Sequence, residues 1–456
     1  MTQANRSLST AQLSDIERTL QTHMRKYGYQ LIDIPIIKPA GIFLTRAGDT
    51  IIDRLFTFER LGQQLTLRPE FTAAAAHRYV SQGYHVPVRW QFSGAIFEDD
   101  PNSISLQYQK QSIGAEFIGQ TGIQATAEVI AMALGGLQKL GIEHKRLVMG
   151  HVGLQMHLLR RFGLDTRTNR MLLAQREYLK QGEAGFAQAK QNIQSMFASV
   201  QTGDAMQEMS KNGIETQKML DVLLDSTRYG TTMGGRSRED IAQRLLSKRT
   251  QTQSYRHIEA ALHFLAEWMQ ISASIDEAFA RIDALIEETD TRGQKLLDNW
   301  RETIDVLTHV YGIDPEQIII QADLTKNWEY YTGAVFGIQA QSGAFIGSGG
   351  RYDDLASILG SDVSVPAVGF AYYMNQLVTA IPDANLPKTQ TILTVTIHDM
   401  PYEEAMTWVQ GLRNQDIAVA LVSENALITA TADGMQYAGQ VYKTQQDLIN
   451  ALEAQG

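Results

Sequence analysis

The sequence contains no cysteine among its 456 residues. Disulfides, thiolate zinc sites, iron–sulfur clusters and cysteine nucleophiles are therefore excluded together. Long apolar runs are also missing, since no segment approaches the ~18 consecutive apolar residues that a membrane span needs. The N-terminal segment MTQANRSLST is polar and lacks the apolar stretch of a secretion signal. These absences predict a soluble, cytoplasmic protein without a membrane partner.

Positive charge is in short supply as well. Lys and Arg number 40 against 50 Asp and Glu, which gives a net charge of −10. A chain of this sign has no global field that attracts nucleic acid. The ten histidines are scattered without metal-ligand spacing, and the string GSGGRY at 347–352 fails the spacing of a GxGxxG phosphate loop. No metal or cofactor is expected, and these glycines predict a tight turn or a close backbone approach.

Periodicity along the chain indicates both helices and paired strands. At ~150 residues per domain, the length allows about three domains. Apolar residues at three- and four-residue intervals predict a helix over 9–27, and 55–69 has the pattern of a hairpin that turns at Leu61–Gly62. Two long antiparallel strands are expected at 88–98 and 106–119, because the DDPNSIS segment between them is rich in turn-forming residues.

The predicted fold is of the α+β class, with a core built on a mainly antiparallel sheet. A Gln-rich, charged and almost entirely helical stretch interrupts this core, and the proline-containing segment IPDANLPKTQ precedes a short C-terminal region. The predicted parts are a first part of the core at 1–163, a helical insertion with returning helices at 164–310, a second part of the core at 311–380, a linker at 381–390 and a small α/β domain at 391–456.

Four short strings are more specific in combination than any one of them alone. They are LTLRPEFT (65–72), EYYTGAVF (329–336), GGRYDDLASILG (349–360) and PAVGFA (366–371). In this order, together with the predicted strand pair, they resemble the histidyl-tRNA synthetase family over about residues 8–380. The resemblance implies a class II aminoacyl-tRNA synthetase-like core that binds histidine and ATP, and a homodimer.

The ATP side of the site departs from the family's pattern. The synthetases need positive side chains on the phosphate, because negative charge builds on its oxygens in the transition state. By resemblance, Glu98 in GAIFEDD and Gln376 in GFAYYMNQL stand where the family has arginines. Glu98 is expected to repel a triphosphate. The two replacements predict that no catalytic residues remain, and that the ligase reaction is lost.

The amino-acid side of the site is better preserved. By resemblance, Glu70 and Thr72 match the contacts to the amino group, and Glu116, Tyr331 and Tyr352 match the contacts to the imidazole. In the same pocket, Lys326 in KNWEYY replaces an arginine of the family, and Ser112 stands where a glutamine is usual. Two interpretations are open: these residues bind histidine, or they satisfy one another's buried hydrogen bonds.

The C-terminal region resembles a shortened anticodon-binding domain of the synthetases. From residue 388 onward it contains three basic and eight acidic residues, a net charge of −5. Lys and Arg contacts to phosphates supply most of the affinity for nucleic acid. We therefore do not expect tRNA to be a partner.

Two further strings resemble a paralogous family, the regulatory subunits of ATP phosphoribosyltransferase. They are PEFT before an alanine-rich helix that ends near His77–Arg78, and LVMGHVGL (147–154). The resemblance implies a non-catalytic protein that binds the short-form catalytic subunit, activates this first step of histidine biosynthesis and mediates feedback by histidine. The alternatives are a histidine–tRNA ligase and an orphan synthetase paralogue that acts as a binding module, since the insertion and the C-terminal region exceed the usual regulatory subunit.

Overall fold

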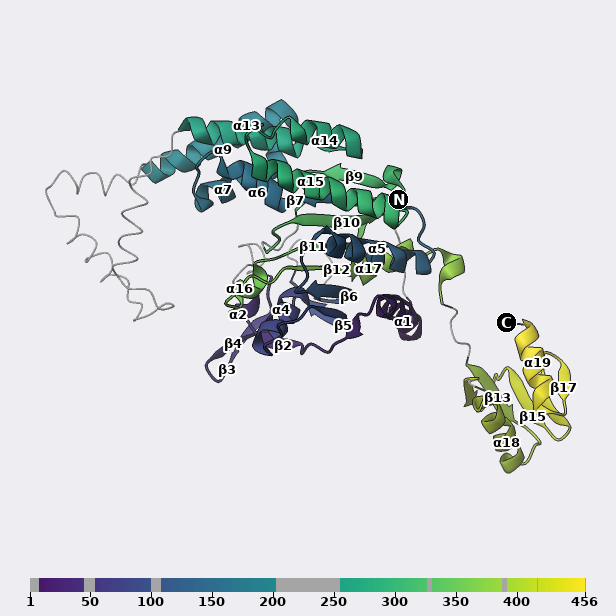
Figure 1. Cartoon of the computed structure of the whole chain (residues 1–456). Coiled ribbons are helices and arrows are strands. Elements are labelled where there is room, and N and C mark those ends of the chain that lie inside the picture. The colour runs from purple at the N-terminus through teal and green to yellow at the C-terminus, as the bar shows by residue number, and fades with distance from the viewer. Residues whose placement is uncertain are drawn as a thin grey trace. The chain divides into compact units, whose positions relative to one another are not determined.

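The structure is a computed structural model, and it describes residues 8–44, 54–99, 108–201, 255–325, 330–387, 392–415 and 417–455. The chain divides into two compact units (Figure 1). One runs mainly over Thr19–Pro382, and the other combines Asp383–Gly456 with Ala4–Arg18. Helix α1 (Thr10–Lys26) fulfils the prediction for 9–27 and spans this division.

A large sheet forms the centre of the first unit. In the described residues its strand order is β1-β5-β6-β12-β11-β10-β7-β9-β8. The strands are β1 (Gln30–Leu31), β5 (Val88–Phe97), β6 (Gln109–Ile118), β7 (Lys145–His151), β8 (Ser272–Ala273), β9 (Ile318–Gln321), β10 (Ala334–Ala340), β11 (Phe345–Arg351) and β12 (Ala367–Tyr373). Only the β1–β5 and β7–β9 pairs are parallel among them. The predicted α+β class with a mainly antiparallel sheet is confirmed.

A small sheet of order β2-β4-β3 stands beside the large one. It contains β2 (Ile37–Pro39), β3 (Thr57–Arg60) and β4 (Gln63–Leu67). The predicted hairpin is confirmed, and it turns at Leu61 and Gly62, whose φ angles are 51° and 74°. Glycine adopts such positive φ angles without steric cost, whereas they are unfavourable for leucine. Leu61 lies at the tip of the turn and is 95% exposed.

Helices cover the large sheet (Figure 1). Those of the core are α2 (Gly41–Leu44), α4 (Thr72–Ser81), α5 (Ile123–Lys139), α6 (Val152–Arg160), α16 (Leu355–Ile358) and α17 (Met374–Ala380). Helix α5 is apolar on most of its surface and is buried on most sides. Its backbone accepts a 2.6 Å hydrogen bond at the Ala133 carbonyl from the Tyr372 hydroxyl of β12, which fixes α5 to the sheet.

The segment predicted as a helical insertion is helical in nearly all of its described residues. It contains α7 (Thr166–Leu173), α8 (Arg176–Leu179), α9 (Gly182–Gln201), α13 (Tyr255–Met269), α14 (Ile275–Asp283) and α15 (Thr291–Asp305), which a π-helical turn, η1 (Val306–Val310), extends; the 3-10 helix η2 (Pro315–Gln317) precedes β9. The exception is β8, which pairs with β9 in the large sheet. Residues 202–254 lie outside the described residues.

The second unit contains a sheet of order β14-β13-β15-β16-β17 in its described part. Its elements are the 3-10 helix η3 (Asp383–Asn385), β13 (Leu393–Ile397), α18 (Tyr402–Arg413), β14 (Val419–Leu421), β15 (Ile428–Thr431), β16 (Gly434–Tyr437), β17 (Gln440–Tyr442) and α19 (Gln445–Gln455). Val395, Leu412 and Ile428 belong to a hydrophobic cluster of its own. The Gln12 side chain of α1 donates a 2.8 Å hydrogen bond to the Pro387 carbonyl, a link that the sequence analysis did not predict.

Candidate functional site

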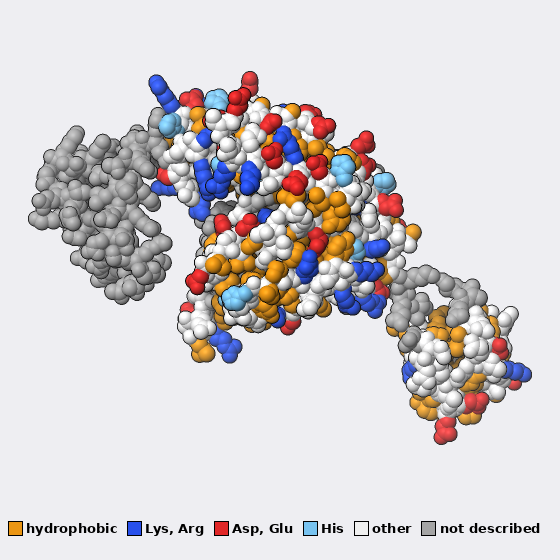
Figure 2. Space-filling view, in the orientation of Figure 1, with side chains coloured by type: hydrophobic (Ala, Val, Ile, Leu, Met, Phe, Trp, Pro, Cys, Tyr) orange, Lys and Arg blue, Asp and Glu red, His pale blue; other side chains and the backbone are white. Residues whose placement is uncertain are grey.

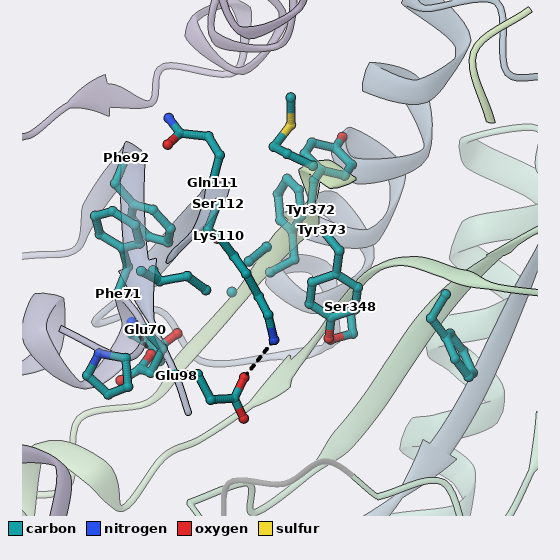
Figure 3. Close-up of a pocket in the computed structure, with 18 of the residues that line it drawn as sticks. Glu70, Phe71, Phe92, Glu98, Lys110, Gln111, Ser112, Ser348, Tyr372 and Tyr373 are labelled. Atoms are coloured by element: carbon teal, nitrogen blue, oxygen red, sulfur yellow. Dashed lines mark hydrogen bonds and ion pairs between the residues drawn. The ribbon is translucent and has the colours of Figure 1, made fainter. Parts of the chain in front are cut away.

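A cavity of about 460 Å³ lies against the large sheet (Figure 3). Its walls come from β5, β6, β11 and β12, from the start of α4, and from α17. The predicted residues Glu70, Thr72, Tyr331 and Tyr352 line it, together with Glu98, Ser112 and Gln376. The fold therefore brings together residues that are up to 306 positions apart in the chain, from Glu70 to Gln376. Lys326 lies outside the described residues.

Glu116 lies beneath the cavity wall and is fully buried. The Thr72 hydroxyl donates to its Oε1 and the Tyr352 hydroxyl donates to its Oε2, both at 2.6 Å. A Cβ atom on Gly369 of β12 would lie 1.5 Å from Glu116 Oε2, so only glycine leaves room for this carboxylate. Burial raises the pKa of Glu116 to about 8, although the two hydrogen bonds lower it in part. The two hydroxyls thus lie between Glu116 and the cavity.

Glu70 lines the cavity at the beginning of α4. Its carboxylate accepts hydrogen bonds from the backbone N–H groups of Thr72 and Ala73, the second at 2.7 Å. Such donors at a helix N-terminus favour a negative charge. Burial nevertheless raises the pKa of Glu70 to about 7, because desolvation outweighs the hydrogen bonds. Glu70 is therefore poised to ionise when a cationic group enters the cavity.

Three tyrosines form an aromatic wall. The Tyr330 ring lies 4.8 Å from the Tyr331 ring and 5.7 Å from the Tyr352 ring, measured between centroids. Burial raises the pKa of all three phenols above its ordinary value, so they remain neutral donors. A Cβ atom on Gly349 would meet the Gly369 backbone carbonyl at 2.1 Å, and one on Gly350 would meet Tyr331 Cδ1 at 2.8 Å. The close backbone approach predicted for the GSGGRY glycines is confirmed.

The Glu98 carboxylate, which also lines the cavity, interacts with two cations. Arg54 Nη1 lies 3.2 Å from Glu98 Oε1, and Lys110 Nζ lies 3.1 Å from Glu98 Oε2, as the dashed line in Figure 3 marks for Lys110. The three charges sum to +1. The repulsion of a triphosphate by Glu98 stays a prediction, and the structure adds two cations that the sequence did not predict beside it. Glu98 acts first on Arg54 and Lys110, whose charges it neutralises in part.

Ser112 and Gln376 are the remaining predicted positions that line the cavity, the first buried and the second exposed. Gln376 lies on α17 and is exposed, and Ser112 lies on β6, where it pairs in register with Tyr373 of β12. The Tyr373 hydroxyl forms a short hydrogen bond with the Ser348 hydroxyl. This pair extends the hydroxyl-rich wall beyond the tyrosines that the resemblance identified.

Sequence reasoning missed Arg54, Lys110, Tyr330 and Tyr373. Lys110 could have been found, since it lies opposite Ile96 in the β5–β6 register and so falls on the same face as Glu98. That register depends on the length of the connecting loop, which the sequence pattern did not determine. Arg54 precedes β3 of the small sheet and gives no periodic signal.

The LVMGHVGL string has a structural role. His151 ends β7, and its Nδ1 accepts a 2.9 Å hydrogen bond from the Leu154 N–H, which caps α6. Burial lowers the pKa of His151 to about 4, so this ring is neutral. A Cβ atom on Gly153 would lie 2.2 Å from the Thr332 carbonyl. These contacts therefore hold the start of α6 against Thr332, the residue that follows Tyr331 of the aromatic wall.

The described residues contain neither a membrane-spanning helix nor a metal-binding cluster. None of their helices is long and apolar enough to cross a membrane. They also contain no group of three or more His, Cys, Asp and Glu side chains that could hold a metal ion.

Comparisons with known proteins agree with the fold and with the resemblance predicted from the sequence. The family model described as histidyl-tRNA synthetase matches residues 8–377. A protein of Allorhizobium ampelinum named ATP phosphoribosyltransferase regulatory subunit is 29% identical over 366 residues, which make up 77% of this chain and 93% of that protein. A protein of the same name from Rhizobium johnstonii is 27% identical over 375 residues, 80% of this chain and 97% of that protein.

Two solved structures share the fold. One is described as an ATP phosphoribosyltransferase regulatory subunit/histidyl-tRNA synthetase from Bacillus halodurans, with a TM-score of 0.65 and 19% identity, covering 99% of this chain and 94% of that one. The other is a histidyl-tRNA synthetase from Nostoc, with a TM-score of 0.57 and 13% identity, covering 100% of this chain and 89% of that one. The predicted class II synthetase-like fold is thereby confirmed.

Proposed function

Since this chain belongs to the histidyl-tRNA synthetase family, we propose that it is the regulatory subunit of ATP phosphoribosyltransferase, the first enzyme of histidine biosynthesis. The relatives that carry this name are matched over 93% and 97% of their length. In this role the chain performs no chemistry of its own. It binds the short-form catalytic subunit, raises its activity and makes it sensitive to histidine.

The observation that carries this proposal is that the basic side chains of the cavity already form ion pairs with Glu98. Two of the described residues that line the cavity are basic, Arg54 and Lys110, and Glu98 forms an ion pair with each of them. Formation of an aminoacyl adenylate needs preorganised donors aimed at the phosphate oxygens. Loss of one such donor costs ~10² to 10³ in rate. A cavity whose cations are already paired is therefore poorly suited to the ligase reaction. The acidic C-terminal region of the chain is, in addition, poorly suited to binding tRNA.

The remaining cavity suits a small cationic amino acid such as histidine. Glu70 lines it as an acceptor for an ammonium group, and the tyrosine hydroxyls can donate to or accept from an imidazole. Glu116 is separated from the cavity by Thr72 and Tyr352. We propose that Glu116 acts indirectly: it accepts the hydrogen bonds of these two hydroxyls, whose oxygens are left to accept hydrogen bonds from the ligand.

We further propose a homodimer within the hetero-oligomer. Leu31, Ile36 and Ile37, near the first strands, are about half exposed in the single chain, at 54%, 45% and 53%. Figure 2 shows apolar side chains gathered on one face of the first unit, and exposed apolar side chains grouped in one short segment are typical of a contact surface. The same segment contributes to the dimer in the family that the sequence resembles.

The decisive experiment mixes purified chain with a short-form catalytic subunit and measures the rate of ATP phosphoribosylation. We expect the rate to rise on mixing and to fall again when L-histidine is added. An unchanged rate with no effect of histidine would contradict the proposal. Histidine-dependent exchange between ATP and pyrophosphate, measured in parallel, is expected to be absent, and a clear exchange signal would instead support the ligase. Failure of both assays would leave a binding module with another partner.

A further inference from the structure

The segment 321–325 connects the helical region with the cavity. It leaves β9 and passes Gly150 of β7, where a Cβ atom would meet the Leu324 side chain at 2.7 Å. Leu324 and Thr325 line the cavity. Leu324 also packs in a small buried cluster with Val335, against which Tyr331 lies. The position of this short segment therefore sets the shape of one cavity wall.

The opposite side of the same segment is held by residues of the helical region. Trp268 of α13 is fully buried, and its Nε1 donates a 2.9 Å hydrogen bond to the Ala322 carbonyl. The Ala322 N–H donates in turn to the Ile271 carbonyl at 3.0 Å. These bonds attach the backbone of the segment to the end of α13.

A single ion pair completes the attachment. Lys180, directly after α8, places Nζ 2.9 Å from Asp323 Oδ2. The Asp323 side chain is 3% exposed and the Lys180 side chain is 34% exposed, so the lysine reaches from the surface to a buried carboxylate. Asp323 Oδ1 accepts a 3.1 Å hydrogen bond from the Gln321 side chain, and α8 is fixed because Gln270 donates to the Leu179 carbonyl at 3.0 Å. Glu177, 75% exposed, lies 3.8 Å from the same lysine, too far for a hydrogen bond.

We propose that Lys180 and Asp323 are positioning residues of the cavity, through which the helical region holds the Leu324–Thr325 wall in its binding conformation. Neither side chain lines the cavity. Their effect passes through the backbone of the segment, since Leu324 follows Asp323 directly. The 2.9 Å contact ties the segment to the end of α8, so the segment is released when either partner of the pair is lost. The ligand readout below rests on the proposed binding of histidine, whereas the exchange readout does not.

The test compares Lys180→Met with Lys190→Met. Lys190 forms the corresponding ion pair of the same helical region, 2.5 Å from Glu259, with both side chains about one third exposed and neither in the cavity wall. Hydrogen–deuterium exchange of the peptides that cover 318–331 is followed in the ligand-free chain. We expect about three- to thirtyfold faster exchange in Lys180→Met only, in the range of coupling found for residues remote from a ligand. Affinity for L-histidine, measured by calorimetry, falls by a similar factor.

Two additional variants separate positioning from general stability. Lys180→Arg restores the cation and is expected to recover wild-type exchange and affinity. The double variant Lys180→Met with Asp323→Asn removes both charges and is expected to keep the faster exchange. A return of the double variant to wild-type behaviour means that the pair only neutralises a buried charge, which overturns the proposal.

The readouts also distinguish this proposal from the proposed function. Unchanged exchange in Lys180→Met overturns the positioning role even if the wild type binds histidine. Faster exchange in a chain that fails to bind histidine supports the positioning role and contradicts histidine as the ligand.

Discussion

Three glutamates at the cavity carry the same carboxylate in three different environments. Glu70 faces backbone N–H groups at the start of a helix, Glu116 is sealed by two hydroxyls, and Glu98 bridges two cations. The resemblance identified all three positions, because each follows or lies within a recognisable string. It identified Thr72 and Tyr352, the partners of Glu116, but not the cations beside Glu98, since Arg54 and Lys110 depend on the loop before β3 and on strand register.

Replacement of Glu98 by glutamine tests whether it occupies a latent anion site. Glu98→Gln leaves the side-chain volume almost unchanged and frees the charges of Arg54 and Lys110. A hydrogen bond to a charged group contributes about 1.5–3 kcal/mol, so we expect the affinity for ATP, measured by calorimetry, to rise by about tenfold or more. The matched control is Asp99→Asn, which changes the net charge equally and leaves the ion pairs intact. Equal ATP affinity in the two variants would show that Glu98 does not restrain these cations.

Replacement of Glu116 by glutamine tests the cost of the buried carboxylate. The pKa of Glu116 rises on folding from 4.5 to about 8, so the folded chain holds this proton more tightly than the unfolded chain. The associated stability is complete below about pH 4.5 and is lost as the pH rises through about 8, at roughly 1.4 kcal/mol for each pKa unit. We expect the melting temperature of the wild type to fall between pH 5.5 and 8.5, and Glu116→Gln to fall less steeply. Some slope remains because Glu70 titrates in the same direction. Parallel curves for the two proteins would contradict the raised pKa.

At the scale of elements, periodicity and turn chemistry were sufficient for long helices and strand pairs. The intervals between Leu13, Ile16, Leu20 and Met24 predicted α1, and the turn-forming segment after Glu98 predicted the β5–β6 pair. The two-residue strand β8 was missed, because it is too short for an alternating pattern and exists only by pairing with β9. The close fit around Glu116 could not be predicted, since it depends on Gly369, 253 positions further along the chain, which the sheet brings opposite it.

That glycine gives a prediction at the level of strand packing. In Gly369→Ala the new Cβ atom lies within bonding distance of Glu116 Oε2, so the carboxylate must leave Thr72 and Tyr352. Overpacking of this kind costs about 1–3 kcal/mol, and we expect a melting temperature several degrees lower together with the loss of histidine binding. Gly41→Ala is the control, because its Cβ atom would meet nothing within 4 Å. Retention of full histidine affinity by Gly369→Ala would mean that Glu116 and its hydroxyl partners do not organise the ligand site.

At the scale of the whole molecule, the two units differ in what they share with the family. The family model covers residues 8–377, so it ends before Asp383, where the C-terminal part of the second unit begins. The second unit has a hydrophobic cluster separate from those of the first, and residues from 388 onward carry a net charge of −5. A region with its own core can fold as a separate unit, and its acidic composition is the basis for the prediction that it does not bind tRNA.

A truncation after Pro387 should therefore separate the cavity from the C-terminal region. The shortened chain keeps every cavity residue and also keeps the Pro387 carbonyl, to which Gln12 donates from α1. We expect its affinity for L-histidine to stay within about twofold of the full chain, because no described residue of the cavity wall is removed. Activation of the short-form catalytic subunit is expected to persist as well. If activation disappears while circular dichroism and histidine binding stay normal, residues 388–456 form part of the contact with the catalytic subunit. In that case the region has kept a partner-binding role in place of the tRNA contact of the synthetases it resembles.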